Sequence, residues 1–489
     1  MNAFDYFFSD SKNLDKNFIL GVAEDASFQQ LYQNSLVLAQ YLKNKIGEDN
    51  KIILLSQNSV FFVTSYLGII KSGNICIPLN SSIEQRNLDY IVALTSCKLS
   101  FLSKHIKSAL NISNTLITES DLEHILQQAQ QSEIKESEVF DNNRIAEIIF
   151  TSGSTGVPKG VMLSHLNICA NTNSIVDYLK LTQNDIIEVV LPFFYCYGLS
   201  LLHTHLKVGA SVVLNNNFFL LGSVIEDLNK YKCTGFAGVP SHYQILLRKS
   251  QTFSKTSFPS LRYVTQAGGK LHNVFIEEFM GILPNINFYV MYGQTEATAR
   301  LSFLQPDLLK SKMGSIGKGI PGVTLMVLDE QNNPVQVGEV GELVAMGENV
   351  MKGYFDDCEA TKEVLRDGLL YTGDLAKFDS EGYIYLVSRK REIIKVGGNR
   401  VSPKEIEEVI LSVTEVVDCT VEGIDDDLLG EAIKATVMLN GTYDRLEMEM
   451  KILQRCREKL SFCKMPRLFE FANNLNINST GKKTKFDLS

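Results

Sequence analysis

The chain has 489 residues, of which 45% are hydrophobic and 21% are charged, and its formal net charge is −9. The length is too great for one hydrophobic core and predicts roughly two to four domains. The ordinary composition indicates a soluble globular protein, and the negative balance argues against nucleic acid or an acidic membrane surface as a partner.

No targeting or membrane-spanning segment is predicted. The first 16 residues lack a basic region followed by an apolar stretch, and the most membrane-like run, residues 60–70, is too short to span a bilayer. The nine cysteines are dispersed and odd in number, which is typical of reduced thiols rather than of a disulfide framework. We therefore expect a cytoplasmic protein.

The N-terminal part of the sequence alternates between helical and strand patterns. Apolar residues recur at helical spacing in residues 27–42, and an apolar helix is predicted over Val60–Lys71. Strands are predicted at Lys51–Leu55 and residues 75–78, while residues 121–144 indicate a helix and a polar linker. This alternation predicts a parallel, doubly wound sheet.

A loop rich in small polar residues follows, within the sequence EIIFTSGSTGVPKGVMLSH at residues 147–165. Apolar runs on both sides predict two strands, and the backbone N–H groups of such a loop can form an anion-binding nest. The composition suits the polyphosphate of a nucleotide, although a surface turn can have the same composition. It is not a Walker loop, because Lys159 precedes Gly160 and a strand follows. The candidate nucleotide-binding residues of the loop are Thr151, Ser152, Gly153, Ser154, Thr155, Gly156 and Lys159.

This stretch resembles the phosphate loop of the adenylate-forming superfamily, which contains acyl-CoA synthetases, peptide-synthetase adenylation domains and beetle luciferases. The family pattern TSGSTGxPKGV, followed by a Ser/Thr-His pair, is matched through Ser164 and His165. The resemblance implies an α/β fold with a large N-terminal domain of doubly wound sheets and a β subdomain, residues 1–388. It also implies a hinge at residues 389–391 and a small mobile α+β C-terminal domain, residues 392–489.

The apolar and aromatic segment at residues 191–210 contains two histidines, His203 and His205. We interpret them as satisfied core histidines, because no Cys, Asp or Glu stands at metal-ligand spacing. The resemblance places Tyr195 and Cys196 on the wall of an acyl pocket. Superfamily members that bind an α-amino acid have an aspartate at the position of Cys196, so a plain organic acid is favoured.

Two glycine-rich stretches lie farther along the chain. Gly268 and Gly269 allow a flat ligand to approach the backbone closely, with a simple turn as the alternative. Residues 317–322 satisfy the pattern G-x-G-x-x-G, but they contain Pro321 and lead into a predicted strand at residues 324–328. A dinucleotide fingerprint should open a helix, so we interpret this second stretch as a β-turn.

The sequence MYGQTEA at residues 291–297 resembles the second signature of the superfamily. The resemblance implies that Tyr292 covers the adenine face, with Gly293 also at the ATP site. It further implies that Thr295 donates to the α-phosphate and that Glu296 binds Mg²⁺.

A third signature, YTGD, ends at Asp374. The resemblance implies that this carboxylate accepts from the ribose hydroxyls, although a solvated turn aspartate is an equally good interpretation of the tetrapeptide alone. The run SRKR at residues 388–391 lies between two predicted strands. The resemblance makes Arg389 a nucleotide contact and Arg391 the hinge, where the superfamily usually has Asp or Lys; a solvated charge run is the alternative.

The C-terminal region contains its own set of predicted elements. Ser402 and Glu405 predict a capping box at the start of a helix. The later elements are strands at residues 415–423, 431–439 and 467–472 and a helix at residues 443–460.

The chain ends in a lysine-rich tail that resembles the last superfamily motif. The resemblance makes Lys482 the lysine of the first reaction step, while a solvated tail is the alternative. Rotation about Arg391 would then replace Lys482 with the face that contains Lys395 and the glycines at residues 397–398.

Together these features predict an enzyme that uses ATP and Mg²⁺ to convert a small carboxylic acid to acyl-AMP and pyrophosphate. The resemblance implies a second step, in which the acyl group passes to the thiol of CoA or of phosphopantetheine on an acyl carrier protein. A standalone amino-acid adenylation enzyme is the alternative within the fold, and a luciferase-like oxygenase is less favoured. A non-catalytic nucleotide-binding protein belongs to another class, against which Lys482 and Glu296 argue.

Overall fold

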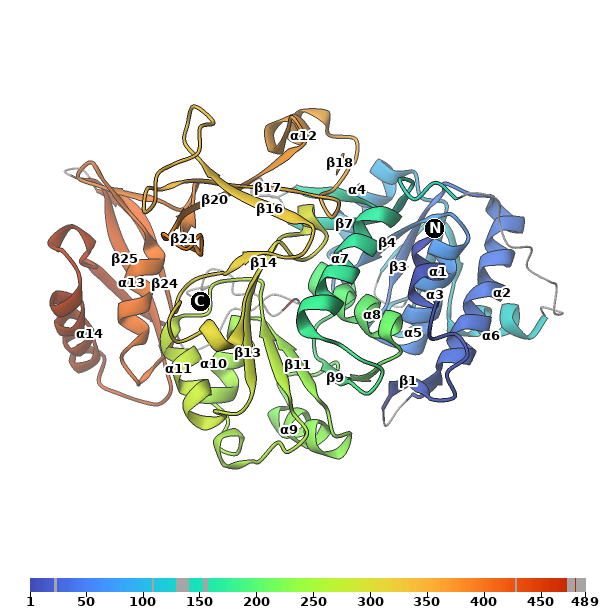
Figure 1. Cartoon of the computed structure of the whole chain (residues 1–489), viewed down its shortest axis with the longest axis horizontal. Coiled ribbons are helices and arrows are strands. Elements are labelled where there is room, and N and C mark those ends of the chain that lie inside the picture. The colour runs from blue at the N-terminus through green and yellow to red at the C-terminus, as the bar shows by residue number, and fades with distance from the viewer. Residues whose placement is uncertain are drawn as a thin grey trace.

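The computed structural model describes residues 1–21, 24–107, 110–128, 140–152, 157–426, 429–472 and residue 480. Two large α/β sheets, a smaller β sheet and a C-terminal α/β unit make up the molecule (Figure 1). This arrangement confirms the predicted fold class.

The first sheet contains seven strands in the order β18-β8-β7-β4-β3-β5-β6. Strands β3 to β7 run parallel, and β8 returns antiparallel to β7. The strands are β3 (Lys51–Leu55), β4 (Ile75–Leu79), β5 (Leu99–Leu102), β6 (Thr115–Ile117), β7 (Ile145–Ser152), β8 (Pro158–Ser164) and β18 (Gly353–Tyr354). The associated helices are α2 (Phe28–Ile46), α3 (Val60–Lys71), α4 (Gln85–Thr95), α5 (Lys104–Lys107) and α6 (Glu119–Gln128).

Local sequence explains two of these helices. α2 begins after Ser27, whose hydroxyl accepts from the N–H of Gln30 at 3.1 Å while Gln30 accepts from the N–H of Ser27 at 2.9 Å. This is a capping box, which satisfies two backbone donors at the helix start. α3 is buried on nearly every side and has the bounds predicted from its apolar run.

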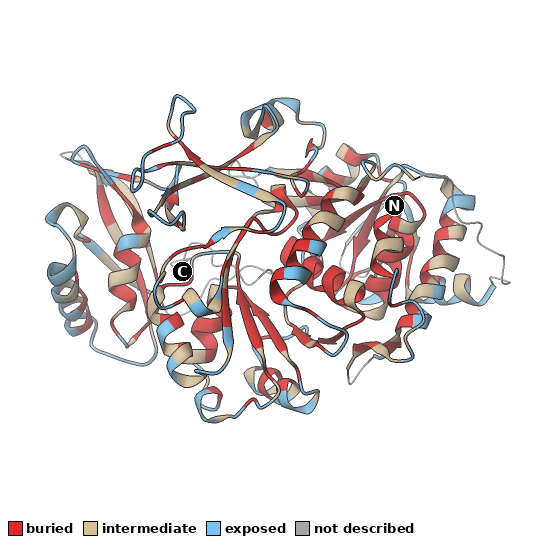
Figure 2. Ribbon diagram, in the orientation of Figure 1, coloured by how far each residue is buried: buried red, intermediate tan, exposed pale blue. Residues whose placement is uncertain are grey.

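The second sheet has nine strands in the order β15-β14-β13-β12-β11-β9-β10-β1-β2. These are β1 (Asn17–Leu20), β2 (Ala26–Ser27), β9 (Ile186–Val189), β10 (Ser211–Leu214), β11 (Gly235–Gly238), β12 (Tyr263–Gln266), β13 (Asn287–Tyr292), β14 (Ser302–Leu304) and β15 (Lys318–Gly319). Its helices are α7 (His165–Leu179), α8 (Cys196–Val208), α9 (Leu221–Lys230), α10 (Pro240–Arg248) and α11 (Asn273–Ile282). The largest hydrophobic cluster joins the two sheets through α1 (Ala3–Phe7), α3, α7 and α8, which Figure 2 shows as mostly buried.

The β subdomain is a five-stranded antiparallel sheet in which β21 lies beside β20. Its elements are β16 (Val323–Leu328), β17 (Gly341–Gly347), β19 (Leu365–Arg366), β20 (Leu369–Phe378), β21 (Ile384–Arg389) and the helix α12 (Cys358–Val364). The G-x-G-x-x-G stretch leads into β16 and opens no helix, as predicted.

The C-terminal unit is a five-stranded sheet with two helices. Its elements are β22 (Ile394–Val396), β23 (Asn399–Val401), α13 (Pro403–Leu411), β24 (Val416–Asp426), β25 (Gly430–Leu439), α14 (Arg445–Lys459) and β26 (Leu468–Ala472). The predicted capping box of α13 is wrong. Ser402 instead donates its hydroxyl to the carbonyl of Val387 at 2.7 Å, and Glu405 pairs with Lys464 at 2.6 Å.

The C-terminal unit packs against α10 and α11 of the second sheet. Glu408 of α13 accepts from the N–H of Asn273 at 2.8 Å and from His272 Nδ1 at 3.0 Å. Arg248 of α10 donates to the carbonyl oxygen of Val416. These contacts hold the C-terminal unit against the larger part of the molecule.

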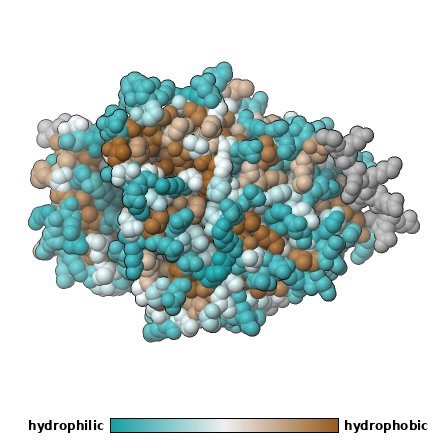
Figure 3. All heavy atoms as spheres, in the orientation of Figure 1, coloured by the Kyte–Doolittle hydropathy of each residue, from teal (hydrophilic) through white to brown (hydrophobic). Residues whose placement is uncertain are grey.

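The surface mixes hydrophilic and hydrophobic side chains. On the face shown in Figure 3, hydrophobic side chains gather over the sheet that contains β16, β20 and β21. Within the described part of the chain, no helix has both the length and the apolar character needed to cross a membrane.

Candidate active site

The predicted phosphate loop joins two paired strands. In the β7–β8 hairpin Thr151 lies opposite Lys159 and Ser152 lies opposite Pro158. The loop residues Gly153, Ser154, Thr155 and Gly156 lie outside the described part of the chain. The hairpin therefore places Lys159 at the base of the predicted anion-binding loop.

A short segment, residues 351–357, ties this hairpin to Glu296. The N–H of Phe355 donates to the carbonyl of Gly160 at 2.7 Å, and the N–H of Met351 donates to the carbonyl of Glu296 at 2.9 Å. From the same segment, the hydroxyl of Tyr354 donates to Glu296 Oε1 at 2.8 Å. Main-chain and side-chain bonds thus fix both ends of the segment.

Lys159 also contacts this segment. Its ammonium nitrogen lies 5.2 Å from the centroid of the Tyr354 ring and 3.8 Å from Asp357 Oδ2. Burial raises the pKa of Tyr354, the charge of Glu296 raises it further, and the positive charge of Arg391 opposes the rise. The phenol therefore stays protonated and donates to Glu296 across the physiological range.

The turn after β13 brings Thr295 to the predicted acyl pocket. Thr295 is buried, and its hydroxyl oxygen lies 3.4 Å from the sulfur of Cys196, the first residue of α8. Tyr195 precedes this helix and is buried too. A Cβ at Gly293 would lie 2.1 Å from the carbonyl oxygen of Ala299, so this tight turn requires glycine.

The predicted nucleoside contacts meet at Asp374. Tyr292 donates its hydroxyl to Asp374 Oδ2 at 2.6 Å, and Arg389 Nε lies 3.4 Å from Oδ1. Asp374 and Arg389 are register partners in the β20–β21 pair. Burial raises the pKa of Asp374, while Arg389 and Tyr292 act in the opposite direction. The carboxylate on β20 is thus held in a defined orientation by side chains from two other strands, β13 and β21.

The glycine pair lies in the turn that follows β12. Gly268 has a φ of 87°, which favours glycine, and the carbonyl of Gly269 accepts from the side-chain amide of Gln266 at 2.7 Å. The backbone of this turn is fixed by that bond.

The residues assigned to the hinge and the second step, Arg391 and Lys395, are both exposed. Arg391 is exposed in the turn between β21 and β22, close enough for its charge to act on Tyr354. Lys395 is exposed on β22, and its N–H donates to Glu431 Oε2 at 2.6 Å. Lys482 lies outside the described residues.

Two residues of the cluster were missed by the sequence analysis, namely Tyr354 and Arg300. Tyr354 follows Gly353 in a two-residue strand, which is too short to give a periodic pattern. Arg300 is 2% exposed, and its guanidinium carbon lies 4.0 Å from the ring centroid of Tyr197. A single arginine after the signature gives no sequence signal that it is buried.

The side chain of Glu296 fits a nucleotide-bound Mg²⁺. Within the described ranges, no group of three or more His, Cys, Asp and Glu side chains is placed to hold a metal ion by itself. Mg²⁺ that binds with a nucleotide needs only one or two carboxylates, because phosphate oxygens and waters complete its coordination. Tyr354 occupies one carboxylate oxygen of Glu296 and leaves the other for a metal.

The two histidines of α8 are buried, as predicted. His203 Nε2 lies 2.8 Å from the hydroxyl of Tyr66, and His205 Nδ1 lies 2.9 Å from the carbonyl of Leu201. Burial lowers the pKa of His203 to about 3 and that of His205 to about 4, so both are neutral. Nε2 of His205 has no hydrogen-bond partner among the described residues, so the prediction that both are fully satisfied is wrong for this atom.

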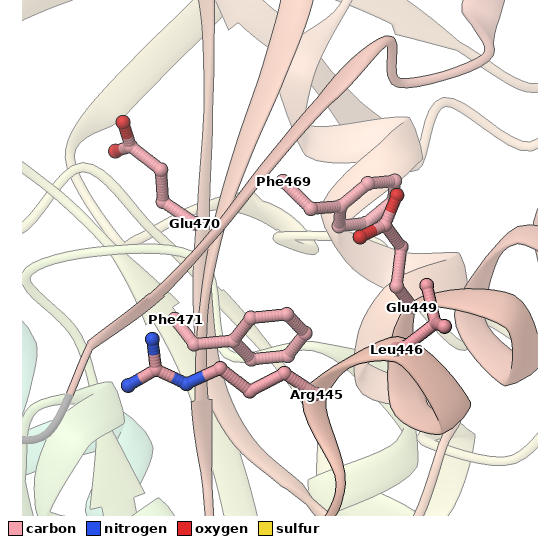
Figure 4. A pocket seen from close by; sticks show the side chains of 6 residues that line it. All are labelled: Arg445, Leu446, Glu449, Phe469, Glu470 and Phe471. Carbon is pink, nitrogen blue, oxygen red and sulfur yellow. The ribbon is translucent and has the colours of Figure 1, made fainter.

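A pocket of about 510 Å³ lies elsewhere, between α14 and β26 of the C-terminal unit (Figure 4). Its lining contains none of the residues described above. The lining residues are Arg445, Leu446, Glu449, Phe469, Glu470 and Phe471.

Comparisons with known proteins match nearly the whole chain. The family model described as "AMP-binding enzyme" matches residues 9–355, and that described as "AMP-binding enzyme C-terminal domain" matches residues 405–482. An oxalate–CoA ligase of Arabidopsis thaliana is 30% identical over 88% of this chain and 86% of its own length.

Two solved structures have the same fold. The anthranilate CoA ligase AuaEII in complex with anthranoyl-AMP has a TM-score of 0.91 at 24% identity, covering 99% of this chain and 95% of its own. ATP-bound MatB from Rhodopseudomonas palustris has a TM-score of 0.87 at 26% identity, covering 98% of this chain and 96% of its own.

Proposed function

Because the chain belongs to the AMP-binding enzyme family, we propose that it joins a carboxylic acid to CoA through an acyl-AMP intermediate. It is an AMP-forming acid–CoA ligase that uses ATP. One observation carries this conclusion: the fold brings together residues that are far apart in the sequence. They are Lys159 of the β7–β8 hairpin, Thr295 and Glu296 after β13, and the hydrogen-bonded pair Tyr292 and Asp374.

The site must overcome repulsion between two anions in the first step. A carboxylate oxygen attacks the α-phosphorus of ATP, the bond to the bridging oxygen breaks, and pyrophosphate leaves. Two like unit charges about 4 Å apart repel by about 4 kcal/mol at an effective dielectric near 20. We assign Lys159 to the phosphates, Thr295 to the α-phosphate and Glu296 to Mg²⁺, which supplies positive charge to the phosphate oxygens when bound.

The nucleoside end of ATP is assigned to a second group of residues. Asp374 would accept from the ribose hydroxyls, and Tyr292 would cover the adenine. Arg389 lies beside Asp374 and would keep its carboxylate ionised, since burial alone disfavours the charge. The turn at residues 268–269 would let the flat base approach the backbone.

The second step and the domain roles complete the proposal. Residues 1–388 would bind ATP and acid, and residues 389–391 would act as the hinge. The mobile part, residues 392–489, would present Lys482 for adenylation and Lys395 for thioester formation, in which the thiol attacks the acyl carbonyl and AMP leaves. The nine free cysteines support a reducing compartment such as the cytoplasm.

CoA is favoured over a carrier protein as the acceptor, because the 30%-identical relative is a CoA ligase. A plain acid is favoured over an α-amino acid. The superfamily aspartate that pairs with an ammonium is replaced by Cys196, and burying an ammonium without a partner costs several kcal/mol.

Pyrophosphate exchange with a panel of carboxylic acids and amino acids tests this proposal. We expect exchange with at least one plain acid, followed by AMP release when CoA is added. A single amino acid that exceeds every plain acid would overturn the acid assignment. Acyl transfer to a phosphopantetheinylated carrier protein but not to CoA would overturn the acceptor assignment.

A further inference from the structure

Arg300 is a buried arginine without a carboxylate partner among the described residues. Its Nε donates to the sulfur of Met291 at 3.3 Å, and its Nη1 donates to the carbonyl of Ala299 at 3.1 Å. Its guanidinium carbon also lies 4.0 Å from the centroid of the Tyr197 ring, and the guanidinium interacts with the side chain of Tyr178. A thioether, a carbonyl, a tyrosine hydroxyl and an aromatic face are all uncharged, and they compensate poorly for the desolvation of a full positive charge.

Two other arginines near the same sheet show the usual arrangement. Arg262 pairs with Asp185 at 2.9 Å, and Arg248 pairs with Glu278 at 2.5 Å. Arg300 is as deeply buried as any arginine of the described chain, yet its positive charge has no such counter-charge. The lack of a counter-charge is therefore particular to Arg300 and is not shared by the other two arginines.

The guanidinium of Arg300 lies next to the predicted acyl pocket. Tyr197, on which it stacks, directly follows Cys196, and Cys196 contacts Thr295. Burial raises the pKa of Tyr195, and the positive charge of Arg300 opposes this rise, so the charge acts on the other side of Cys196 too.

The backbone of Arg300 is held firmly. Its carbonyl accepts from the side-chain amides of Asn171 at 3.1 Å and Asn349 at 2.7 Å. A fixed backbone and a ring-stacked side chain keep the guanidinium in place before any ligand arrives, which is the preorganisation that selective binding requires.

We propose that Arg300 binds a second acidic group of the acyl substrate, so that this enzyme activates short dicarboxylic acids. This inference rests on the proposed function and specifies its acid. A guanidinium presents a planar fork that matches a carboxylate through two parallel hydrogen bonds. One carboxylate of the substrate would react at the α-phosphate, and the other would neutralise Arg300.

The expected acid is short, because Arg300 stacks on the residue adjacent to Cys196, which itself contacts Thr295. A purely structural role for Arg300 would lead to a different substrate preference. It would stabilise the fold but would not distinguish a diacid from a monoacid of the same length. The preference between these two classes therefore tests the proposal, whereas total activity does not.

Pyrophosphate exchange should be measured with the diacids from oxalate to adipate and with the matching monoacids. For the wild type we expect the best diacid to exceed its monoacid counterpart by about 100-fold or more in kcat/KM, because a site built around a polar partner rejects the analogue that lacks it. Arg300→Met should remove this preference by lowering kcat/KM for the diacid about 100-fold while keeping or raising it for the monoacid. Arg300→Lys should keep the preference at a lower kcat/KM, since it retains the charge but loses the fork.

Arg262→Met serves as the matched control, because it removes an arginine that already has a carboxylate partner. It should lower the melting temperature and leave the diacid preference unchanged. Arg300→Met should melt at or above the wild-type temperature, since it removes an unpaired buried charge.

A wild-type enzyme that prefers monoacids overturns the inference while the proposed function stands, and this result needs no variant to fold. An unchanged preference in Arg300→Met overturns it as well. If no acid of either class supports exchange, the proposed function fails and the inference fails with it.

Discussion

At the scale of single residues, the hydroxyl of Tyr354 is the contact that orients the predicted magnesium ligand. It donates to one oxygen of Glu296 and leaves the other free to bind a metal. Removing a partner of this kind typically weakens metal binding about 10- to 100-fold. We expect Tyr354→Phe to raise the Mg²⁺ concentration that half-saturates pyrophosphate exchange by about 10-fold, and to weaken Mn²⁺ binding by a similar factor in titrations with a non-hydrolysable ATP analogue.

The control for this variant is Tyr371→Phe. The hydroxyl of Tyr371 donates to Asn332 at 3.1 Å in the β subdomain and makes no contact with Glu296. Its loss should leave the Mg²⁺ dependence as in the wild type. If Tyr354→Phe also has the Mg²⁺ dependence and the Mn²⁺ affinity of the wild type, Tyr354 has no role in metal binding.

Site residues that stand in a recognisable motif could be predicted from the sequence, whereas residues placed by tertiary contacts could not. Tyr292 and Asp374 stand in two short signatures of the superfamily, and the structure joins their side chains at 2.6 Å. Tyr354 and Arg300 owe their environment to contacts between distant segments, which neither periodicity nor a short motif encodes. The roles of all these residues stay predictions until they are tested.

At the scale of elements, a buried hydrogen-bond network connects the strand of the phosphate loop to the acyl-pocket helix. Tyr66 of α3 donates its hydroxyl to Glu147 of β7 at 2.8 Å and lies 2.8 Å from His203 of α8. Burial raises the pKa of Glu147 from 4.5 to about 7, while Tyr66 acts in the opposite direction. The folded state therefore holds a proton on Glu147 that the unfolded state has already lost above about pH 4.5.

This difference in proton binding gives a stability prediction. Between pH 4.5 and about 7 the folded state binds more protons than the unfolded state, so the free energy of unfolding falls as pH rises. Glu147→Gln should remove this decline, which amounts to about 3 kcal/mol at most. Urea unfolding of the wild type and of Glu147→Gln at pH 5 and pH 8 measures this difference. If the free energy of unfolding changes equally with pH in both proteins, the pKa of Glu147 is not raised by folding.

Helix and strand positions were predicted best where the local pattern agrees with the tertiary packing. The helix Val60–Lys71 is apolar on every side because α1 and α2 and the first sheet surround it. The capping box at Ser402 failed because a tertiary acceptor, the carbonyl of Val387, competes for the serine hydroxyl. A local rule does not contain such a partner.

At the scale of the whole molecule, the proposal requires adenylation and thioester formation to use the same site with two different lysines. Lys482→Ala should abolish pyrophosphate exchange and leave acyl transfer from isolated acyl-AMP largely intact. Lys395→Ala should show the opposite pattern, because the proposal assigns Lys395 to the second step alone and its side chain is exposed on β22 in the observed state. Single-turnover assays of each half-reaction measure this, and equal loss of both half-reactions in either variant would contradict the assigned role.

The proposed rotation must also break the observed docking of the C-terminal unit. Glu408 would have to leave the N–H of Asn273 and the ring of His272, and Arg248 would have to leave the carbonyl of Val416. Apolar side chains of the second sheet and of the C-terminal unit also belong to one hydrophobic cluster, so the rotation must separate apolar contacts as well as these polar bonds.

Arg391→Pro tests the hinge itself. Arg391 lies between β21 and β22, in the turn that the N–H of Glu392 closes on the carbonyl of Arg389 at 3.0 Å, and its φ is not positive. Proline fixes φ near −65° and restricts the preceding residue, which should block the rotation of a whole domain about this point. We expect pyrophosphate exchange to continue at a rate within a few-fold of the wild type while thioester formation from isolated acyl-AMP collapses.

The control is Arg391→Ala, which removes the same side chain but keeps the backbone free to rotate. Lys390→Pro is unsuitable as a control, because the N–H of Lys390 donates to the carbonyl of Gly373 at 3.0 Å. Wild-type acyl transfer by Arg391→Pro would show that rotation at this residue is not part of the mechanism.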